Sequence, residues 1–134
     1  MKIKIGINGM GRIGRMILRS IYEGNKKIEI SHINNRTSSE TCSTLLKYDS
    51  IHGKFKADIS YDEKNLIVNK NKISFGQETD LNKIDWKKYG VDYVFECTGK
   101  FNSKDKLIPH LNNGAKKVIV SAPCKNADKT IVFG

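Results

Sequence analysis

The stretch "GINGMGRIGR", residues 6–15, decides the fold of this chain. Three of its glycines, Gly9, Gly11 and Gly14, stand in the pattern G-x-G-x-x-G. That pattern alone has little specificity, because it acquires a meaning only when a strand precedes it and a helix follows it. The residues on either side of the stretch therefore have to be read before a fold or a function is assigned.

Both sides supply the required context. Residues 2–8 alternate apolar and polar side chains, which predicts a short strand, and residues 28–33 alternate again. Between them, residues 11–23 place apolar side chains at helical spacing, so the arginines of this segment are expected mostly away from the apolar face. The apolar positions are Ile13, Ile17, Leu18 and Ile21, and the arginines are Arg12, Arg15 and Arg19. The sequence thus predicts a βαβ unit of about 30 residues.

The rest of the chain continues the alternation of strands and helices. Helices are expected at 37–48 and 103–112, with a helical turn around Trp86. Strands are expected at 91–97, 117–120 and 130–133, and three short strands separated by polar turns at 57–61, 66–68 and 72–75. We therefore predict an α/β fold, a Rossmann-type doubly wound parallel sheet with helices on both faces and a small inserted antiparallel meander.

In this context the glycine stretch predicts a dinucleotide site. Gly9 permits a tight turn, Gly11 lets a pyrophosphate approach the backbone, and Gly14 lets the helix pack closely against the strand. The N-terminus of the helix offers free N–H groups and partial positive charge to phosphate, and Arg12 adds a full charge. The alternative is a glycine turn that binds no ligand.

The end of the second predicted strand bears on which dinucleotide would bind. An NAD site usually has an acidic residue there to accept hydrogen bonds from the ribose hydroxyls. This chain has Asn35 followed by Arg36, which would not repel a 2′-phosphate and could pair with it. The residues slightly favour NADP or dual use, although Asn35 could still bind the ribose of NAD while Arg36 points into water.

Composition excludes several other classes of protein. The net charge is +10, from 24 Lys and Arg against 14 Asp and Glu, but the lysines are dispersed and form no basic stripe, so nucleic acid is a disfavoured partner. No apolar run approaches the length of a membrane span, and no signal peptide is expected, because residues 1–6 lead directly into patterned structure. The three cysteines are too few and too scattered for a disulfide framework, and without a CxxC pair they disfavour a structural zinc site. A reduced cytosol fits this cysteine usage best.

Four separated motifs carry a resemblance to a known family. "KIGINGMGRIGR", "LLKYDSIHGKF", "FECTGKF" and "GAKKVIVSAP" occur in this order along the 134 residues. Together they resemble the N-terminal half of glyceraldehyde-3-phosphate dehydrogenase, and the related erythrose-4-phosphate dehydrogenase shares most of them. The resemblance implies a dinucleotide-binding domain, NAD or NADP as cofactor, and a homotetramer in the cytoplasm for the whole protein.

The resemblance also implies which residues contact the cofactor. They belong to the phosphate loop, the ribose and adenine side, and the nicotinamide side, where Ile13 would pack. These residues are Asn8, Gly9, Gly11, Arg12, Ile13, Asn35, Thr79, Thr98, Gly99, Phe101 and Ser121. The glycine motif and the chemistry at the end of the second strand add Gly14 and Arg36 to the expected cofactor site. Asn35 stands where the family usually has an aspartate, so a strict preference for NAD is in doubt.

No catalytic residue is expected in this chain. In the family, the catalytic cysteine and its histidine partner follow the segment that corresponds to residues 1–134, so we expect an incomplete dinucleotide-binding domain that ends before its last parallel strand. The small phosphorylated aldehyde would bind only to the full-length protein, and the fragment alone would be inactive. Cys42, Cys97 and Cys124 are not expected to be nucleophiles, and the three histidines are expected to be structural or at the surface. The alternative from another class is a stand-alone nucleotide- or RNA-binding module.

Overall fold

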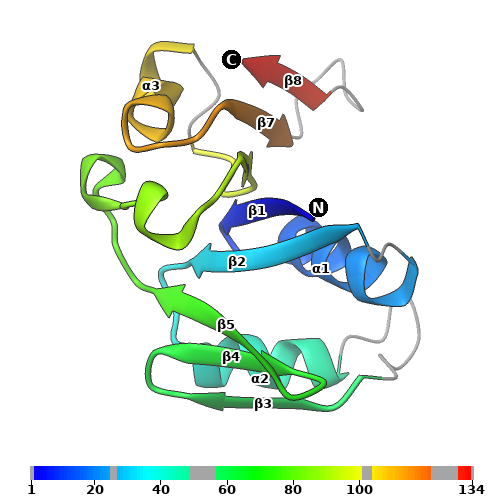
Figure 1. Ribbon diagram of the computed structural model, residues 1–134. Helices are drawn as coiled ribbons and strands as arrows, with labels where there is room; N and C mark the ends of the chain where they lie inside the picture. The colour runs from blue at the N-terminus through cyan, green and yellow to red at the C-terminus, as the bar shows by residue number, and fades with distance from the viewer. Residues whose placement is uncertain (1, 25–26, 49–56, 101–103, 122–129, 134) are drawn as a thin grey trace.

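A computed structural model of the chain describes residues 2–24, 27–48, 57–100, 104–121 and 130–133. Strands and helices alternate along it, as the sequence predicts (Figure 1). The elements are β1 (Ile3–Asn8), α1 (Arg12–Gly24), β2 (Ile28–Asn34), α2 (Ser39–Tyr48), β3 (Ile59–Asp62), β4 (Asn65–Val68), β5 (Asn71–Gly76), the short 3₁₀ turns η1 (Leu81–Lys83) and η2 (Lys87–Tyr89), β6 (Tyr93–Glu96), α3 (Lys104–Asn112), β7 (Lys117–Ser121) and β8 (Thr130–Phe133).

The strands form one sheet in the order β3-β4-β5-β2-β1-β6-β7-β8. The five central strands, β5, β2, β1, β6 and β7, run parallel. β3, β4 and β5 form the expected antiparallel meander, whose last strand joins the parallel part by pairing with β2. The predicted fold class is therefore confirmed. β8 departs from the parallel pattern, because it pairs antiparallel with β7 at the edge of the sheet.

Two hydrophobic cores cover the two faces of the sheet. One core packs α1 and α2, through Leu18 and Leu46, against Ile5 and Ile7 of β1. The other core packs α3, through Leu107, and the segment that contains the two 3₁₀ turns, through Leu81 and Trp86, against the opposite face of the sheet. Neighbouring residues of a strand point to opposite faces, so the even-numbered residues of β1 point toward the second core. This is the doubly wound arrangement that the sequence predicts.

Close packing at β1 explains the first glycine of the opening stretch. A Cβ on Gly6 would collide with the ring of Trp86, with Cε3 only 2.7 Å away. Trp86 is completely buried, and its ring occupies the space that Gly6 leaves open. The glycine therefore lets a large aromatic side chain lie directly on the central strand.

One expectation about α1 is wrong. The sequence places Arg19 away from the apolar face, yet the residue is 5% exposed. Its guanidinium lies 3.8 Å from the carboxylate of Glu23, one turn further along the helix. A long aliphatic stem allows an arginine to cover apolar surface while its charged end finds a partner, and a binary apolar pattern does not reveal this.

Candidate functional site

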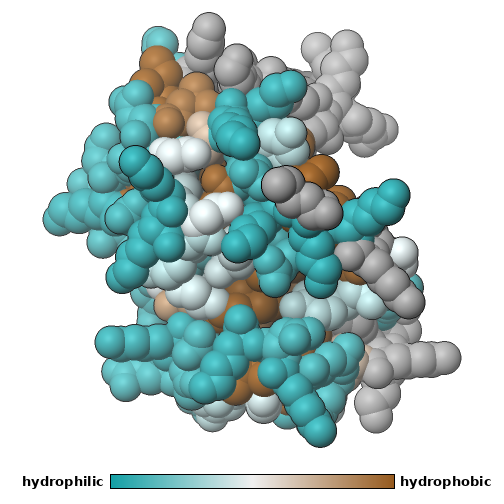
Figure 2. All heavy atoms as spheres, in the orientation of Figure 1, coloured by the Kyte–Doolittle hydropathy of each residue, from teal (hydrophilic) through white to brown (hydrophobic). Residues whose placement is uncertain are grey.

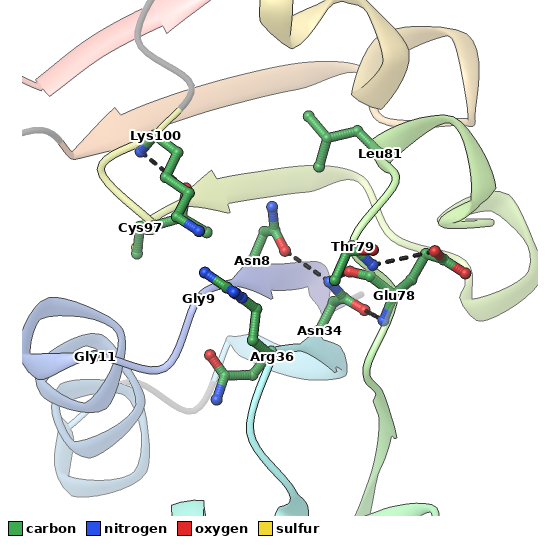
Figure 3. A pocket seen from close by; sticks show the side chains of 12 residues that line it. Asn8, Gly9, Gly11, Asn34, Arg36, Glu78, Thr79, Leu81, Cys97 and Lys100 are labelled. Atoms are coloured by element: carbon green, nitrogen blue, oxygen red, sulfur yellow. Dashed lines mark hydrogen bonds between the residues drawn. The ribbon is translucent and has the colours of Figure 1, made fainter.

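A pocket of about 360 Å³ lies at the carboxyl ends of β1, β2 and β6 (Figure 3). β1 is the switch point of the sheet, because the chain continues from it to β2 on one side and reaches β6 on the other. In doubly wound sheets, ligands bind at this point. The lining residues come from the three strand ends and from the segment after β5. They are Asn8, Gly9, Gly11, Asn34, Asn35, Arg36, Glu78, Thr79, Leu81, Cys97, Thr98 and Lys100.

The three glycines of the motif have different roles in the loop beneath the pocket. Gly9 has a φ of +101°, which favours glycine, and a Cβ there would lie 2.8 Å from the main-chain nitrogen of Thr98. At Gly14 a Cβ would collide with the carbonyl oxygen of Gly9. At Gly11 a Cβ would meet no atom within 4 Å. Gly9 and Gly14 are thus required by the fold, whereas the space in front of Gly11 is open.

The helix α1 begins directly after Gly11, so its N-terminus lies beside the pocket. The first N–H groups of an α-helix have no partner within the helix and carry a partial positive charge. An anionic group in front of Gly11 would meet these groups at short range. Arg12 is exposed at the first position of the helix. The loop and helix together form a cradle that suits a phosphate.

Asn35 lines the pocket and also makes hydrogen bonds within the protein that the sequence does not predict. Its Oδ1 accepts a hydrogen bond of 2.9 Å from the main-chain N–H of Met10, inside the glycine loop. Its Nδ2 donates to Thr37 Oγ1 at 2.7 Å and to Cys42 Sγ at 3.3 Å. The carboxamide therefore ties the end of β2 to the glycine loop. An aspartate would offer a second oxygen and a negative charge at this place, and the asparagine offers neither.

Asn34 and Glu78 join β2 to the segment after β5. Nδ2 of Asn34 donates to the carbonyl oxygen of Glu78 at 2.8 Å, and Oδ1 accepts from the main-chain N–H of Glu78 at 2.8 Å. The Glu78 carboxylate in turn accepts from the main-chain N–H groups of Thr79 and Asp80, both at 3.1 Å. This closed set of hydrogen bonds fixes the wall of the pocket that carries Thr79 and Leu81.

Two cations stand at the pocket. Figure 3 shows the Arg36 side chain extending from the end of β2 toward the glycine loop, and Lys100 follows β6 on the other side. Gln77 holds the main chain of Arg36 by donating to its carbonyl oxygen at 3.2 Å. Within the described ranges, no carboxylate forms an ion pair with the Arg36 guanidinium, which leaves its hydrogen-bond donors available to a ligand.

Burial disfavours the thiolate form of the two described cysteines, Cys42 and Cys97, and the thiolate is the nucleophilic form. Burial, with a smaller effect of the nearby Glu96, raises the pKa of the Cys97 thiol to about 12, although this residue lines the pocket. Burial also raises the pKa of Cys42. The described histidines, His32 and His110, are buried and hydrogen-bond to groups other than these thiols. Cys124 and His52 lie outside the described residues.

The pocket gathers many, but not all, of the predicted site residues. Among those that line it are Asn8, Gly9, Gly11, Asn35, Arg36, Thr79 and Thr98. Arg12, Ile13 and Gly14 lie in the first turn of α1 and Gly99 lies in the turn after β6, and none of the four is on the pocket wall. Phe101 lies outside the described residues, and of Ser121 only the main chain, at the end of β7, is described. The pocket wall also includes residues that the sequence does not single out for binding: Asn34, Glu78, Leu81, Cys97 and Lys100.

Other classes of site have no counterpart in the described segments. There, no group of three or more His, Cys, Asp or Glu side chains is arranged to hold a metal ion. None of the helices in that part of the chain is long and apolar enough to cross a membrane. Figure 2 shows hydrophilic side chains spread over the visible face, with smaller hydrophobic areas between them.

The switch-point pocket, the glycine loop and the helix N-terminus define a dinucleotide-binding domain of the Rossmann class. A family model described as "Glyceraldehyde 3-phosphate dehydrogenase, NAD binding domain" matches residues 3–104, and the chain belongs to this family. The resemblance seen in the sequence is thereby confirmed.

Individual relatives agree with the family match. The chain is 46% identical to glyceraldehyde-3-phosphate dehydrogenase 2 of Bacillus subtilis over 134 residues, which is 100% of this chain and 39% of that protein. It is 48% identical to glyceraldehyde-3-phosphate dehydrogenase of Thermotoga maritima over 132 residues, covering 98% of this chain and 40% of the relative. For the enzyme of Geobacillus stearothermophilus the identity is 46%, with 100% of this chain and 40% of the relative covered. The chain thus spans about two fifths of the length of these relatives.

Proposed function

We propose that the chain binds NAD in the switch-point pocket and serves as the cofactor-binding part of an oxidoreductase. The observation that carries this proposal is the open space in front of Gly11, beside the N-terminus of α1. In a loop where Gly9 and Gly14 are required by the fold, Gly11 has no neighbour that excludes a side chain. A pyrophosphate in that space accounts for the glycine, because it needs close approach to the backbone.

The pocket suggests a role for each group of residues. The glycine loop and Arg12 would hold the pyrophosphate, and Asn35 would position the loop. Thr79 and Leu81 on one wall, and Thr98 and Lys100 on the other, would enclose the adenosine half. The pocket volume of about 360 Å³ falls within the range for small-molecule sites. Ile13, Gly99, Phe101 and Ser121 are proposed as further contacts on the family resemblance.

For the whole protein we propose oxidative phosphorylation of glyceraldehyde 3-phosphate to 1,3-bisphosphoglycerate. The relatives named glyceraldehyde-3-phosphate dehydrogenase support this reaction. Bound NAD would accept hydride from the substrate, and this chain's residues would bind and orient it. The raised thiol pKa values of Cys42 and Cys97 support the proposal that residues 1–134 alone do not turn over the aldehyde. A cytoplasmic homotetramer is proposed for the whole protein on the resemblance.

We also propose that NADP is accepted beside NAD. The proposal is supported by the neutral Asn35, whose oxygen is already used by Met10, and by Arg36 at the pocket. A 2′-phosphate would meet no carboxylate at residue 35 and would find a guanidinium next to it. The family description names NAD, so the expectation is use of both cofactors rather than exclusion of NAD.

Calorimetry and thermal unfolding with NAD⁺ test the binding proposal. We expect saturable binding and a rise in Tm with NAD⁺ concentration, because a ligand that binds only the folded state stabilises it. RNA binding that falls steeply with salt, with no effect of NAD⁺ on Tm, would favour the stand-alone RNA-binding module instead. Turnover of glyceraldehyde 3-phosphate by residues 1–134 would contradict the proposed inactivity of the fragment.

A further inference from the structure

A chain of buried hydrogen bonds runs under the pocket from Trp86 to Glu78. It passes through His110, Glu96, Asn8 and Asn34, which are each at most 3% exposed. Asn8, Asn34 and Glu78 belong to the pocket wall, whereas Trp86 belongs to the second core and His110 lies on α3. The network therefore connects the pocket with the core on the α3 side of the sheet.

The direction of the hydrogen bonds is fixed at the Glu78 end. Main-chain groups cannot exchange their donor and acceptor roles, so the N–H and C=O of Glu78 set the orientation of the Asn34 carboxamide. Nδ2 of Asn34 then donates to Oδ1 of Asn8 at 2.9 Å. This leaves Nδ2 of Asn8 to donate to Oε1 of Glu96, at 2.7 Å.

The direction is equally fixed at the other end. The indole N–H of Trp86 can only donate, and it lies 2.9 Å from Nδ1 of His110. Nδ1 is therefore an acceptor, and the ring proton of His110 lies on Nε2. That N–H points at Oε1 of Glu96 at 2.9 Å. Both directions of the network thus end at Glu96.

The second oxygen of Glu96 is also an acceptor. Its Oε2 receives hydrogen bonds from the main-chain N–H of Thr98 at 3.0 Å and from the Thr98 hydroxyl at 2.7 Å. Glu96 accepts from four donors while only 1% exposed, so each of its oxygens acts as an acceptor and no carboxyl proton is required. The hydrogen bonds define an ionised carboxylate paired with a neutral histidine.

We propose that Glu96 is a positioning residue for the dinucleotide. Its buried carboxylate holds the amide of Asn8 at the end of β1 and the turn that carries Thr98 after β6, so the ends of these two neighbouring strands are preset before the cofactor arrives. This role rests on the proposed binding of NAD in the pocket. A group that only stabilises the core would change the stability of the fold and leave the affinity for NAD⁺ unchanged.

The isosteric substitution Glu96→Gln tests the role, because the amide must turn an NH₂ toward one pair of donors. The NH₂ would then face two N–H or O–H donors and repel them, and the remaining oxygen would accept more weakly because the side chain has lost its charge. We therefore expect the Kd for NAD⁺ to rise about tenfold. The matched control is Val118→Ala, a truncation in the second core away from the pocket, with Val118 at 0% exposure. The control should lower Tm and keep Kd within about twofold.

Nuclear magnetic resonance of the wild-type chain gives a second test that does not need the variant to fold. At pH 7 the side-chain carbon of Glu96 should report a carboxylate, and the nitrogens of His110 should report a proton on Nε2 only. A protonated Glu96 or a doubly protonated His110 overturns the inference, as does an unchanged Kd in a folded Glu96→Gln variant. If the wild-type chain itself fails to bind NAD⁺, the proposed function is what fails.

Discussion

The carbonyl oxygen of Gly9 occupies the place where Gly14 would carry a side chain. This contact brings the start of α1 close against the turn after β1, while Gly11, between the two residues, faces open space. The three glycines of one motif can therefore be separated by experiment into those that the fold requires and the one that the ligand requires.

We expect Gly14→Ala to destabilise the chain by about 2 kcal/mol, because the new methyl group has to displace backbone rather than a flexible side chain.

Gly11→Ala should leave the free energy of unfolding within about 0.5 kcal/mol of wild type. It should nevertheless weaken NAD⁺ binding at least about tenfold, because the methyl group would stand where the pyrophosphate approaches the backbone. Urea unfolding and calorimetry measure the two effects, and a Gly11→Ala variant with wild-type affinity would contradict the pyrophosphate assignment.

Cofactor preference can be tested at the end of β2. Arg36→Ala should weaken binding of NADP more than binding of NAD, because only NADP carries the phosphate that the guanidinium would pair with. Asn35→Asp should shift the preference toward NAD, since a carboxylate keeps an acceptor for the Met10 N–H and repels a 2′-phosphate. The ratio of the two Kd values, measured by calorimetry, is the readout. An equal loss of both affinities in Arg36→Ala would rule out a role for this residue in selecting the cofactor.

His32 should make the stability of the chain depend on pH. Burial, with a smaller contribution from Lys88, lowers its pKa from 6.5 to about 4 in the folded state. The unfolded chain therefore takes up a proton on this residue as the pH falls below about 6.5, while the folded chain stays neutral until about 4. The contribution of His32 to the free energy of unfolding is therefore full above pH 6.5. It falls by roughly 3 kcal/mol in total as the pH falls to 4.

The variant His32→Phe isolates this effect. Phenylalanine keeps a ring to stack on Tyr89, where the centroids lie 3.9 Å apart, and cannot titrate. It loses the hydrogen bond to Ser74 at 3.0 Å, so it should be less stable at neutral pH. The gap in unfolding free energy between wild type and variant should shrink between pH 6.5 and 4. A gap that stays constant over this range would show that His32 does not titrate as described.

Cys97 should resist alkylation although it lines the pocket. With a thiol pKa of about 12, very little thiolate forms at neutral pH, and the thiolate is the reactive species. We expect iodoacetamide at pH 7.5 to leave Cys97 unmodified in the folded chain and to modify it in urea, as measured by peptide mass spectrometry. Rapid modification of Cys97 in the native chain would indicate a more polar surrounding than the structure shows.

The fold could be predicted because its signals are local. Alternation in residues 2–8 and 28–33, helical spacing after Gly11 and three short strands near residues 57–75 each lie within a few neighbouring residues, and all of them appear in the structure. β8 was expected as a strand of a parallel sheet, but it pairs antiparallel with β7, the strand directly before it in the chain. The apolar run within residues 130–133 does not itself carry the direction of pairing.

The site was only partly predictable, for the same reason. Gly9, Gly11 and Thr98 follow from a motif and a resemblance, and the structure places them around one pocket. Glu96 and His110 looked like ordinary members of a strand and a helix, because their meaning comes from contact with each other inside the protein. Asn35 was predicted to face the ribose, and its link to Met10 could be seen only once the loop and the strand end were in place.

The position of β1 in the middle of the sheet also affects synthesis of the chain. β1 is made first, and its partner on one side, β6, is made much later: Asn8 and Glu96 are 88 residues apart. While the ribosome is still translating the meander, β1 can pair with β2 but has one open edge. The carboxylate of Glu96, which holds Asn8 and Thr98 beneath the pocket, is made only after the meander. Nascent chains halted before β6 should therefore be targets for chaperones that recognise unpaired strands.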